Sequence, residues 1–196
     1  MPLPVHARAP VSAALVLACL LGACGTERAR VPDPNSMLPD SKTIRTVDFP
    51  RAGLSVRVQR PIGLVRRRPP EVFRFSLASG AIVSVLAYPR KEPVPRSPSA
   101  LREARRRLVA AVRKRDPTFR VAGARVVRVA GAPGVEVVGT QTLSGGRLET
   151  RSVHLFKGKG EYVLELIAPR TDFGPADTQV FSPMLRSLEL TGRIRG

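Results

Sequence analysis

His154 is the residue best suited to acid–base chemistry near neutral pH, because the unperturbed pKa of imidazole is about 6.5. It alternates with Val153 and Leu155, so on an expected strand its side chain lies on the opposite face, with Thr150 and Ser152. A Ser–His–acid triad would also need a serine on a sharp turn, and the chain has no G-x-S-x-G motif. We therefore expect a histidine on a sheet surface and no catalytic residues.

No other group of residues has the spacing of a catalytic or cofactor site. Glu161 and Glu165 share a strand face at a spacing too wide for a close carboxylate pair. Gly158-Lys159-Gly160 has the composition of a turn, and no glycine-rich phosphate-binding loop occurs. Once a signal peptide is removed, His154 is the only histidine, so we expect no metal site and no cofactor.

The thiol of Cys24 is the other reactive group. Its neighbours form Leu21-Gly22-Ala23-Cys24, which resembles the lipobox of bacterial lipoproteins. In a lipobox a branched aliphatic side chain fills an apolar pocket of the signal peptidase, and small residues let the backbone enter the active site. The resemblance implies a diacylglyceryl group on the Cys24 sulfur and cleavage after Ala23, which would make Cys24 the lipidated N-terminus.

The residues before Cys24 have the pattern of a secretory signal. Arg8 supplies a positive charge, and Val11 to Leu21 form an apolar run that is shorter than the roughly 20 residues needed to span a bilayer. An ordinary cleaved signal peptide is the main alternative, and Cys19 is a second candidate for lipidation that leaves a much shorter apolar core. We expect a signal peptide over 1–23 and an extracytoplasmic protein anchored to the cell membrane.

The composition of the chain indicates an anionic partner. Lys and Arg total 33 against 15 acidic residues, and the formal net charge is +18. Such a domain is attracted to anionic lipid, acidic wall polymers or nucleic acid. An address outside the cytoplasm argues against nucleic acid, as do the absence of Trp and an aromatic content of 5%. Because the only cysteines are Cys19 and Cys24, we expect no disulfide.

Two basic clusters are candidates for binding an anionic surface. Arg66-Arg67-Arg68 lies in an expected proline-flanked loop, and Arg106, Arg107 and Arg113 lie on one side of an expected helix. These residues are either ordinary solvated charge or contacts to anionic lipid, wall polymer or an envelope protein. The sequence leaves open whether the two clusters share one side of the domain.

The pattern after the signal peptide predicts a flexible tether and then a single α+β domain. Residues 24–42 are polar and contain three prolines, and residues 43–196 alternate in the manner of strands. Strands are expected at 44–49, 54–59, 72–77, 81–88 (a central strand), 119–129, 135–143, 147–157 and 161–168. A hairpin turn is expected at Ser144-Gly145-Gly146.

Two helices are expected in this domain. One covers Leu101–Arg115, is capped by Ser97 or Ser99 and ends at Asp116-Pro117, and a short one covers part of Pro175–Ser187. The apolar stripe of the first helix consists of Leu101, Ala104, Leu108, Ala111 and Val112. Runs of strands with isolated helices predict an antiparallel sheet that carries the main helix and the short C-terminal helix on one face.

Three segments resemble the PsbP-like fold, which includes DcrB-type and LpqN-type envelope lipoproteins. They are Phe49-Pro50-Arg51-Ala52-Gly53-Leu54-Ser55-Val56, Val129-Ala130-Gly131-Ala132-Pro133-Gly134 and Phe181-Ser182-Pro183-Met184-Leu185-Arg186-Ser187-Leu188. The resemblance covers about residues 44–190, lacks the tryptophan that many relatives place near the position of Leu64, and carries no catalytic residue. It implies a non-enzymatic envelope accessory domain.

These sequence features are compatible with three functions. The first is a lipid-anchored extracytoplasmic domain that binds or scaffolds at the cell envelope. The second is a carrier or sensor of a small apolar ligand, which a cavity beside the 101–115 helix would favour. The third is an envelope hydrolase, which would need an acid and a nucleophile beside His154.

Overall fold

The computed structural model describes residues 44–59, 64–143 and 145–195. The expected signal peptide (1–23), the tether (24–42) and Cys24 lie outside these residues. The described part of the chain begins within the expected α+β domain.

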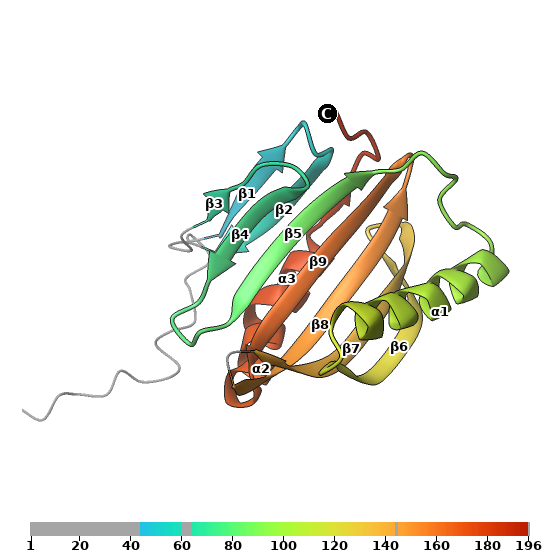
Figure 1. The fold of residues 1–196 in the computed structure, drawn as a ribbon. Helices are drawn as coiled ribbons and strands as arrows, with labels where there is room; N and C mark the ends of the chain where they lie inside the picture. Colours follow the sequence, from blue (N-terminus) through green and yellow to red (C-terminus); the bar gives the residue numbers. More distant parts are fainter. Residues whose placement is uncertain (1–43, 60–63, 144, 196) are drawn as a thin grey trace, which may run out of the picture. The chain divides into compact units, whose positions relative to one another are not determined.

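Strands and helices follow one another along the described residues in the order that Figure 1 shows. Their bounds are β1 Ile44–Phe49, β2 Leu54–Gln59, β3 Val65–Arg66, β4 Glu71–Ser76, β5 Ile82–Pro89, α1 Pro98–Arg115, β6 Arg120–Val129, β7 Ala132–Leu143, β8 Gly146–Lys157, β9 Gly160–Pro169, α2 Arg170–Ala176, η3 Asp177–Phe181, α3 Ser182–Arg186 and β10 Glu189–Leu190.

The strands of the described residues form two antiparallel sheets. The larger has the order β3-β4-β5-β9-β8-β7-β6, and the smaller has the order β1-β2-β10. Long hairpins make up most of the larger sheet; Lys157 of β8, for example, pairs with Gly160 of β9 across a turn in which Gly158 has a φ of +60°. The expected α+β class with an antiparallel sheet is confirmed.

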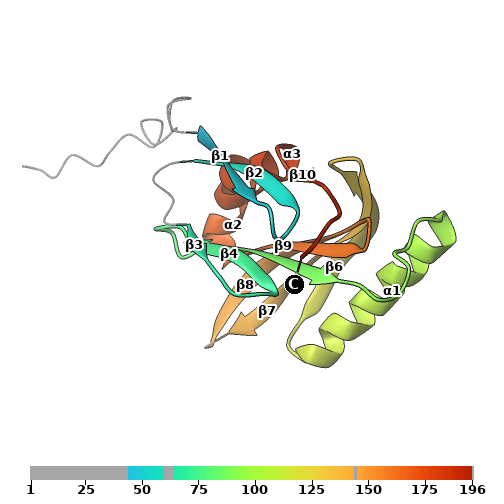
Figure 2. The same cartoon turned by 90° about the horizontal axis from the view of Figure 1, so that it is seen from above.

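Both faces of the larger sheet are covered, and the expectation of one covered face is wrong (Figure 2). On one face α1 packs on β6 and β7, where Leu101 and Val112 meet Val135, Val137 and Phe156. On the other face β1, β2 and the helical segment α2–η3–α3 enclose the larger core. The two faces show in the sequence of β8, where the consecutive residues Leu155 and Phe156 are both buried.

Helix α1 begins where the sequence predicts a cap. The Ser97 side chain accepts a hydrogen bond from the Ala100 N–H at 3.1 Å, and Asp116 follows the last turn. Leu101 and Val112 are buried, whereas Ala111, expected on the same stripe, is exposed. The residues that face the sheet, Leu101, Ala104, Leu108 and Val112, follow an i, i+3, i+7, i+11 spacing, and Ala111 lies at the margin of that stripe.

The C-terminal helical segment is longer than expected. It begins at Arg170, directly after β9, and continues to Arg186 through η3, a π-helical stretch. We expected a short helix over part of Pro175–Ser187. Pro175 instead lies inside α2, which begins five residues earlier. The length of the segment lets it cross the sheet and bury Phe181, Met184 and Leu185 in the core of this face.

Two local expectations also need correction. Val65–Arg66 forms the short strand β3 beside β4, so Arg66 does not lie in a loop. Strand β7 begins at Ala132, earlier than expected, because Ala130 and Gly131 alone make the hairpin turn. Their φ angles of 51° and 70° are those of the tight turn that matches strand twist.

Candidate functional site

The structure separates the two basic clusters. Arg66, Arg67 and Arg68 lie at the β3 edge of the larger sheet, whereas α1 packs on β6 and β7 at the opposite edge. The clusters therefore do not form one patch, and each has to be judged by its own surroundings.

The arginines of α1 are partly neutralised within the helix. The Arg107 Nε donates to Glu103 Oε1 at 2.7 Å, and Arg106 pairs with the other oxygen of the same carboxylate. These hydrogen bonds lower the pKa of Glu103. Arg113 lies beside Phe119 and Arg120 at a shallow hollow of about 350 Å³. This face of α1 has the features of solvated charge.

An apolar groove of about 770 Å³ lies at the other cluster. We call it the arginine groove. Its residues come from the β1–β2 turn, the β3–β4 connection, the end of β5 and the C-terminal segment, and they are Phe49, Pro50, Arg51, Ala52, Arg66, Arg67, Pro69, Pro70, Glu71, Val72, Ala87, Pro89, Ile194 and Arg195. The volume lies in the range of small-molecule sites, about 300–1,000 Å³.

Backbone hydrogen bonds hold the walls of the arginine groove. The Arg195 N–H donates to the Arg51 carbonyl at 2.7 Å, which joins the C-terminal segment to the β1–β2 turn. The Ala87 N–H donates to the Pro70 carbonyl at 2.8 Å, which joins the β3–β4 connection to β5. Because main-chain bonds fix both walls, the groove exists without a ligand.

The floor of the groove is apolar and aromatic, and its rim is cationic. Phe49 is 5% exposed and stacks on Phe73 with ring centroids 4.8 Å apart. The Arg66 guanidinium lies over the Phe49 ring, 5.0 Å from its centroid. Arg51, Arg66, Arg67 and Arg195 are exposed, and Glu71 is the one carboxylate among the lining residues.

His154 has an acidic neighbour that the sequence analysis missed. His154 Nδ1 and Glu161 Oε1 are 2.9 Å apart, and Arg90 Nη1 donates to Glu161 Oε2 at 2.5 Å. Burial raises the pKa of Glu161, but the hydrogen bonds from His154 and Arg90 outweigh it and leave that pKa below its ordinary value. The expected three-residue turn Gly158-Lys159-Gly160 would place the His154 and Glu161 side chains on opposite faces of the sheet. In the structure Lys157 pairs with Gly160, and this register places His154 and Glu161 diagonally on one sheet face.

This arrangement lacks a nucleophile. Across the described residues, no serine or threonine hydroxyl is hydrogen-bonded to His154. Glu165, on the same strand face as Glu161, has no hydrogen-bonded partner there, and burial raises its pKa. In the same part of the chain, no three acidic or histidine side chains are placed to bind one metal ion. The helices found there are all too short or too polar to cross a membrane.

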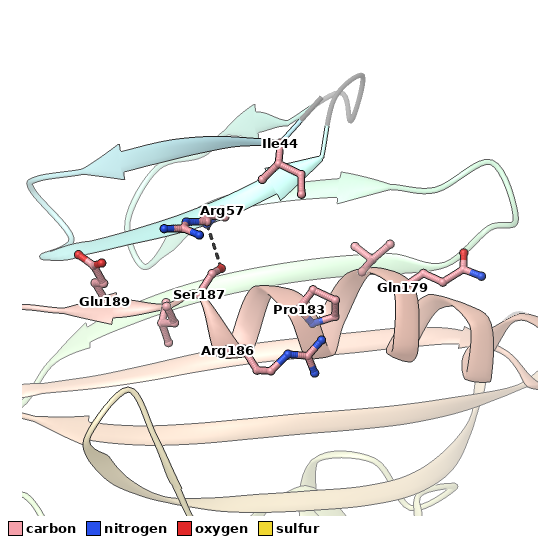
Figure 3. A pocket seen from close by; sticks show the side chains of 9 residues that line it. Ile44, Arg57, Gln179, Pro183, Arg186, Ser187 and Glu189 are labelled. Atoms are coloured by element: carbon pink, nitrogen blue, oxygen red, sulfur yellow. Dashed lines mark hydrogen bonds between the residues drawn. The ribbon is translucent and has the colours of Figure 1, made fainter. Parts of the chain in front are cut away.

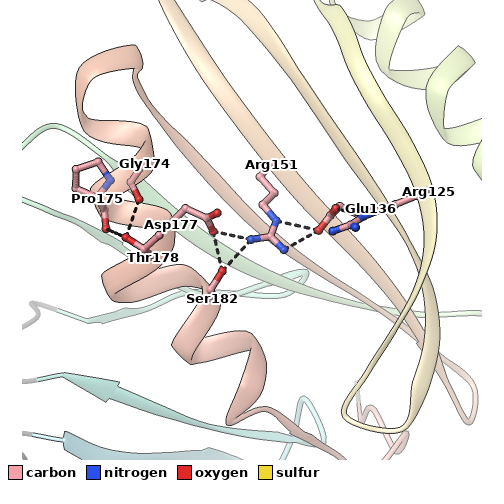
Figure 4. Close-up of polar contacts among 8 residues, drawn as sticks. All are labelled: Arg125, Glu136, Arg151, Gly174, Pro175, Asp177, Thr178 and Ser182. Carbon is pink, nitrogen blue, oxygen red and sulfur yellow. Dashed lines mark hydrogen bonds and ion pairs between the residues drawn. The ribbon is translucent and has the colours of Figure 1, made fainter.

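A second polar network joins the sheet to the C-terminal helical segment (Figure 4). Glu136, whose side chain is 6% exposed, accepts hydrogen bonds from Arg125 at 2.6 Å and from Arg151 at 2.7 and 2.9 Å. Arg151 also donates to Asp177 at 2.6 Å and to Ser182 at 2.9 Å. Its guanidinium lies 5.5 Å from the Phe181 ring centroid. Every charge is paired, so this network has a structural role.

Another pocket, of about 430 Å³, lies between the β1–β2 hairpin and α3 (Figure 3). The Arg57 backbone N–H donates to Ser187 Oγ at 3.1 Å across it. Its charged lining residues are Arg57, Arg186 and Glu189, so it has less positive charge than the arginine groove. The arginine groove is the larger and more cationic of the two, and we take it as the candidate binding site.

The comparisons with known proteins identify the fold. No protein-family model matches the chain, and no curated protein sequence matches it. The solution structure of cyanobacterial PsbP (CyanoP) from Synechocystis sp. PCC 6803 superposes with a TM-score of 0.59 at 10% identity, covering 87% of this chain and 98% of that one. The fold is PsbP-like.

Two further solved structures are similar to the PsbP-like domain. A crystal structure from Bacteroides thetaiotaomicron VPI-5482 has a TM-score of 0.51 at 12% identity and covers 76% of this chain and 48% of that one. LpqN, involved in cell envelope biogenesis of Mycobacterium tuberculosis, has a TM-score of 0.42 at 17% identity and covers 79% and 82%. The likeness to PsbP predicted from the three sequence segments is confirmed, and it establishes the fold alone.

Proposed function

We propose that this chain is a lipid-anchored, extracytoplasmic accessory domain that binds a component of the cell envelope and does not catalyse a reaction. The arginine groove is the observation that carries the binding role. It is apolar, held in shape by backbone hydrogen bonds and bordered by four arginines, whereas His154 is engaged with Glu161, which also pairs with Arg90.

The location rests on Cys24. The Leu21-Gly22-Ala23-Cys24 motif predicts a thioether-linked diacylglyceryl group, and its two acyl chains are sufficient for stable membrane association. On a tethered domain even weak attraction to the surface is sufficient for docking, because the tether keeps the local concentration high.

The packing between α1 and the sheet bears on the alternative of a small-ligand carrier. The residues between α1 and the sheet form a packed cluster, which supports scaffolding over a carrier cavity at that helix. For the hydrolase alternative, Glu161 beside His154 supplies the required acid. No hydroxyl of the described residues is hydrogen-bonded to His154 as a nucleophile would be.

Labelling with a radioactive or clickable fatty acid in cells tests the anchor. Wild-type protein should be labelled and should sediment with membranes, and Cys24→Ser should lose the label and release the domain. Cys19→Ser is the matched control, because it removes the other cysteine and should keep both properties. Absence of label from wild-type protein, or its loss in Cys19→Ser with retention in Cys24→Ser, would refute anchoring through Cys24.

A further inference from the structure

We propose that the arginine groove binds an anionic amphiphile, a molecule with a hydrocarbon tail and a phosphate or carboxylate headgroup. This inference deepens the proposed function, since it names the ligand class of the same groove. It does not need the anchor, because binding to the groove can be measured whether or not Cys24 is lipidated.

The floor of the groove provides the site for the tail. Phe49, Val72, Ala87 and Ile194 line it, and the ring of Phe49 is fixed from behind by stacking on Phe73. An apolar surface that is concave and already formed favours burial of a flexible hydrocarbon chain, because the protein loses little freedom on binding.

The charge balance of the rim selects an anion. Glu71 is already engaged, with Arg74 Nε at 2.7 Å from one carboxylate oxygen and Arg67 Nε at 3.8 Å from the other. Arg51, Arg66 and Arg195 have no carboxylate partner among the described residues. Three guanidinium groups therefore surround the groove without a counter-charge, and phosphate or carboxylate oxygens are the acceptors that guanidinium binds most strongly.

Arg66 lies where the apolar floor of the groove meets its cationic rim. Its guanidinium is held over the Phe49 ring, and a guanidinium stacked on an aromatic face keeps its N–H edge free for hydrogen bonds. A headgroup bound by Arg66 would thus have its tail directed along the floor that Phe49 begins. Arg68, two residues further along the chain, is exposed and does not line the groove.

Titration of the full chain, isolated from its envelope in decyl maltoside, tests the proposal. Decyl phosphate is the probe, since it has the tail of the background detergent and differs only in the headgroup, and inorganic phosphate supplies the headgroup alone. Binding is followed by the rise in the unfolding temperature and by hydrogen exchange of the 49–52 and 66–72 segments. We expect decyl phosphate to raise the temperature and protect both segments, and inorganic phosphate to do neither at the same concentration.

Two charge-matched variants separate a site from general attraction. Arg66→Gln should weaken decyl phosphate binding about tenfold or more, the usual effect of losing a charge-assisted hydrogen bond, and Arg68→Gln should change it little. Ala52→Phe fills the groove without altering its charge and should also weaken decyl phosphate binding. If Arg66→Gln does not fold, Ala52→Phe still tests whether the ligand binds in the groove.

Four results would overturn the proposal. Arg66→Gln and Arg68→Gln could lose decyl phosphate affinity equally, or inorganic phosphate could protect the two segments from exchange as well as decyl phosphate does. Decyl phosphate could also protect only segments outside these two, or cause no response at all. None of these results bears on fatty-acid labelling of Cys24, so failure of the ligand class is distinguishable from failure of the anchor.

Discussion

At the scale of single residues, two glutamates on one strand face have opposite electrostatic surroundings. Glu161 is hydrogen-bonded to His154 and Arg90, whereas Glu165 is half-buried with Arg115 as its main favourable charge. The pKa of Glu161 lies below its ordinary value, and burial holds the pKa of Glu165 above it. The two residues therefore contribute to stability with opposite signs.

The pH dependence of two variants follows from these shifts. A carboxyl group whose pKa is lowered by folding stabilises the fold above its unfolded-state pKa, and that contribution is lost as the pH falls. A carboxyl group whose pKa is raised destabilises the fold once the pH exceeds its unfolded-state value. Glu161→Gln should thus lower the unfolding temperature at pH 7, and Glu165→Gln should raise it.

Thermal unfolding at pH 7 and pH 4 measures both effects. The gain in Glu165→Gln should shrink toward pH 4, because the carboxyl group of the unfolded state becomes protonated as the pH falls through its ordinary pKa of about 4.3. A loss of stability in Glu165→Gln at pH 7 would show that Glu165 has a favourable partner in the folded protein.

The residues of the arginine groove could be only partly predicted. Arg66 and Arg67 were candidates because three arginines are adjacent in the sequence. Arg51 and Arg195 were not, because they are 144 positions apart and come together only through the Arg195–Arg51 backbone hydrogen bond. Long-range register of this kind leaves no local pattern in the sequence.

At the scale of elements, the strands were the most predictable part. Alternation of buried and exposed residues identified β2, β4 and β9 within one or two residues, because each has two distinct faces. The two-residue strand β3 is too short to show a period. The start of α2 at Arg170 was missed because Pro175 lies inside this helix, a position where proline is disfavoured.

The contact between the sheet and the C-terminal helical segment depends on Arg151. Its guanidinium links Glu136 on β7 to Asp177 and Ser182 on the helical segment (Figure 4). Removing Arg151 would leave Asp177 without a cationic partner among the described residues and Glu136 with the exposed Arg125 alone. Arg151→Met should therefore lower the free energy of unfolding by about 3 kcal/mol.

Arg125→Met is the control for this prediction. Arg125 contacts the same carboxylate, but its side chain is 70% exposed, so its loss should cost about 1 kcal/mol or less. Urea denaturation of both variants gives the two values. Equal costs would mean that Arg151 does not hold the helical segment to the sheet.

At the scale of the whole molecule, the described domain has its open, cationic groove at one edge of the larger sheet and a packed helix at the other. The sequence predicted the strong positive charge and could not assign it to a surface. Within that charge, Arg106 and Arg107 are paired with Glu103 on α1. Arg51, Arg66 and Arg195 at the groove have no carboxylate partner among the described residues.

Site-specific photocrosslinking in living cells tests most directly whether this domain acts by binding at the envelope through its groove. A photoreactive amino acid is placed at Pro50, which lines the groove and is exposed, or at Ala111, which is exposed on α1. We predict that illumination attaches an anionic envelope molecule to the protein at position 50 and not at position 111. The same adducts from both positions, or no adduct from position 50, would contradict the account.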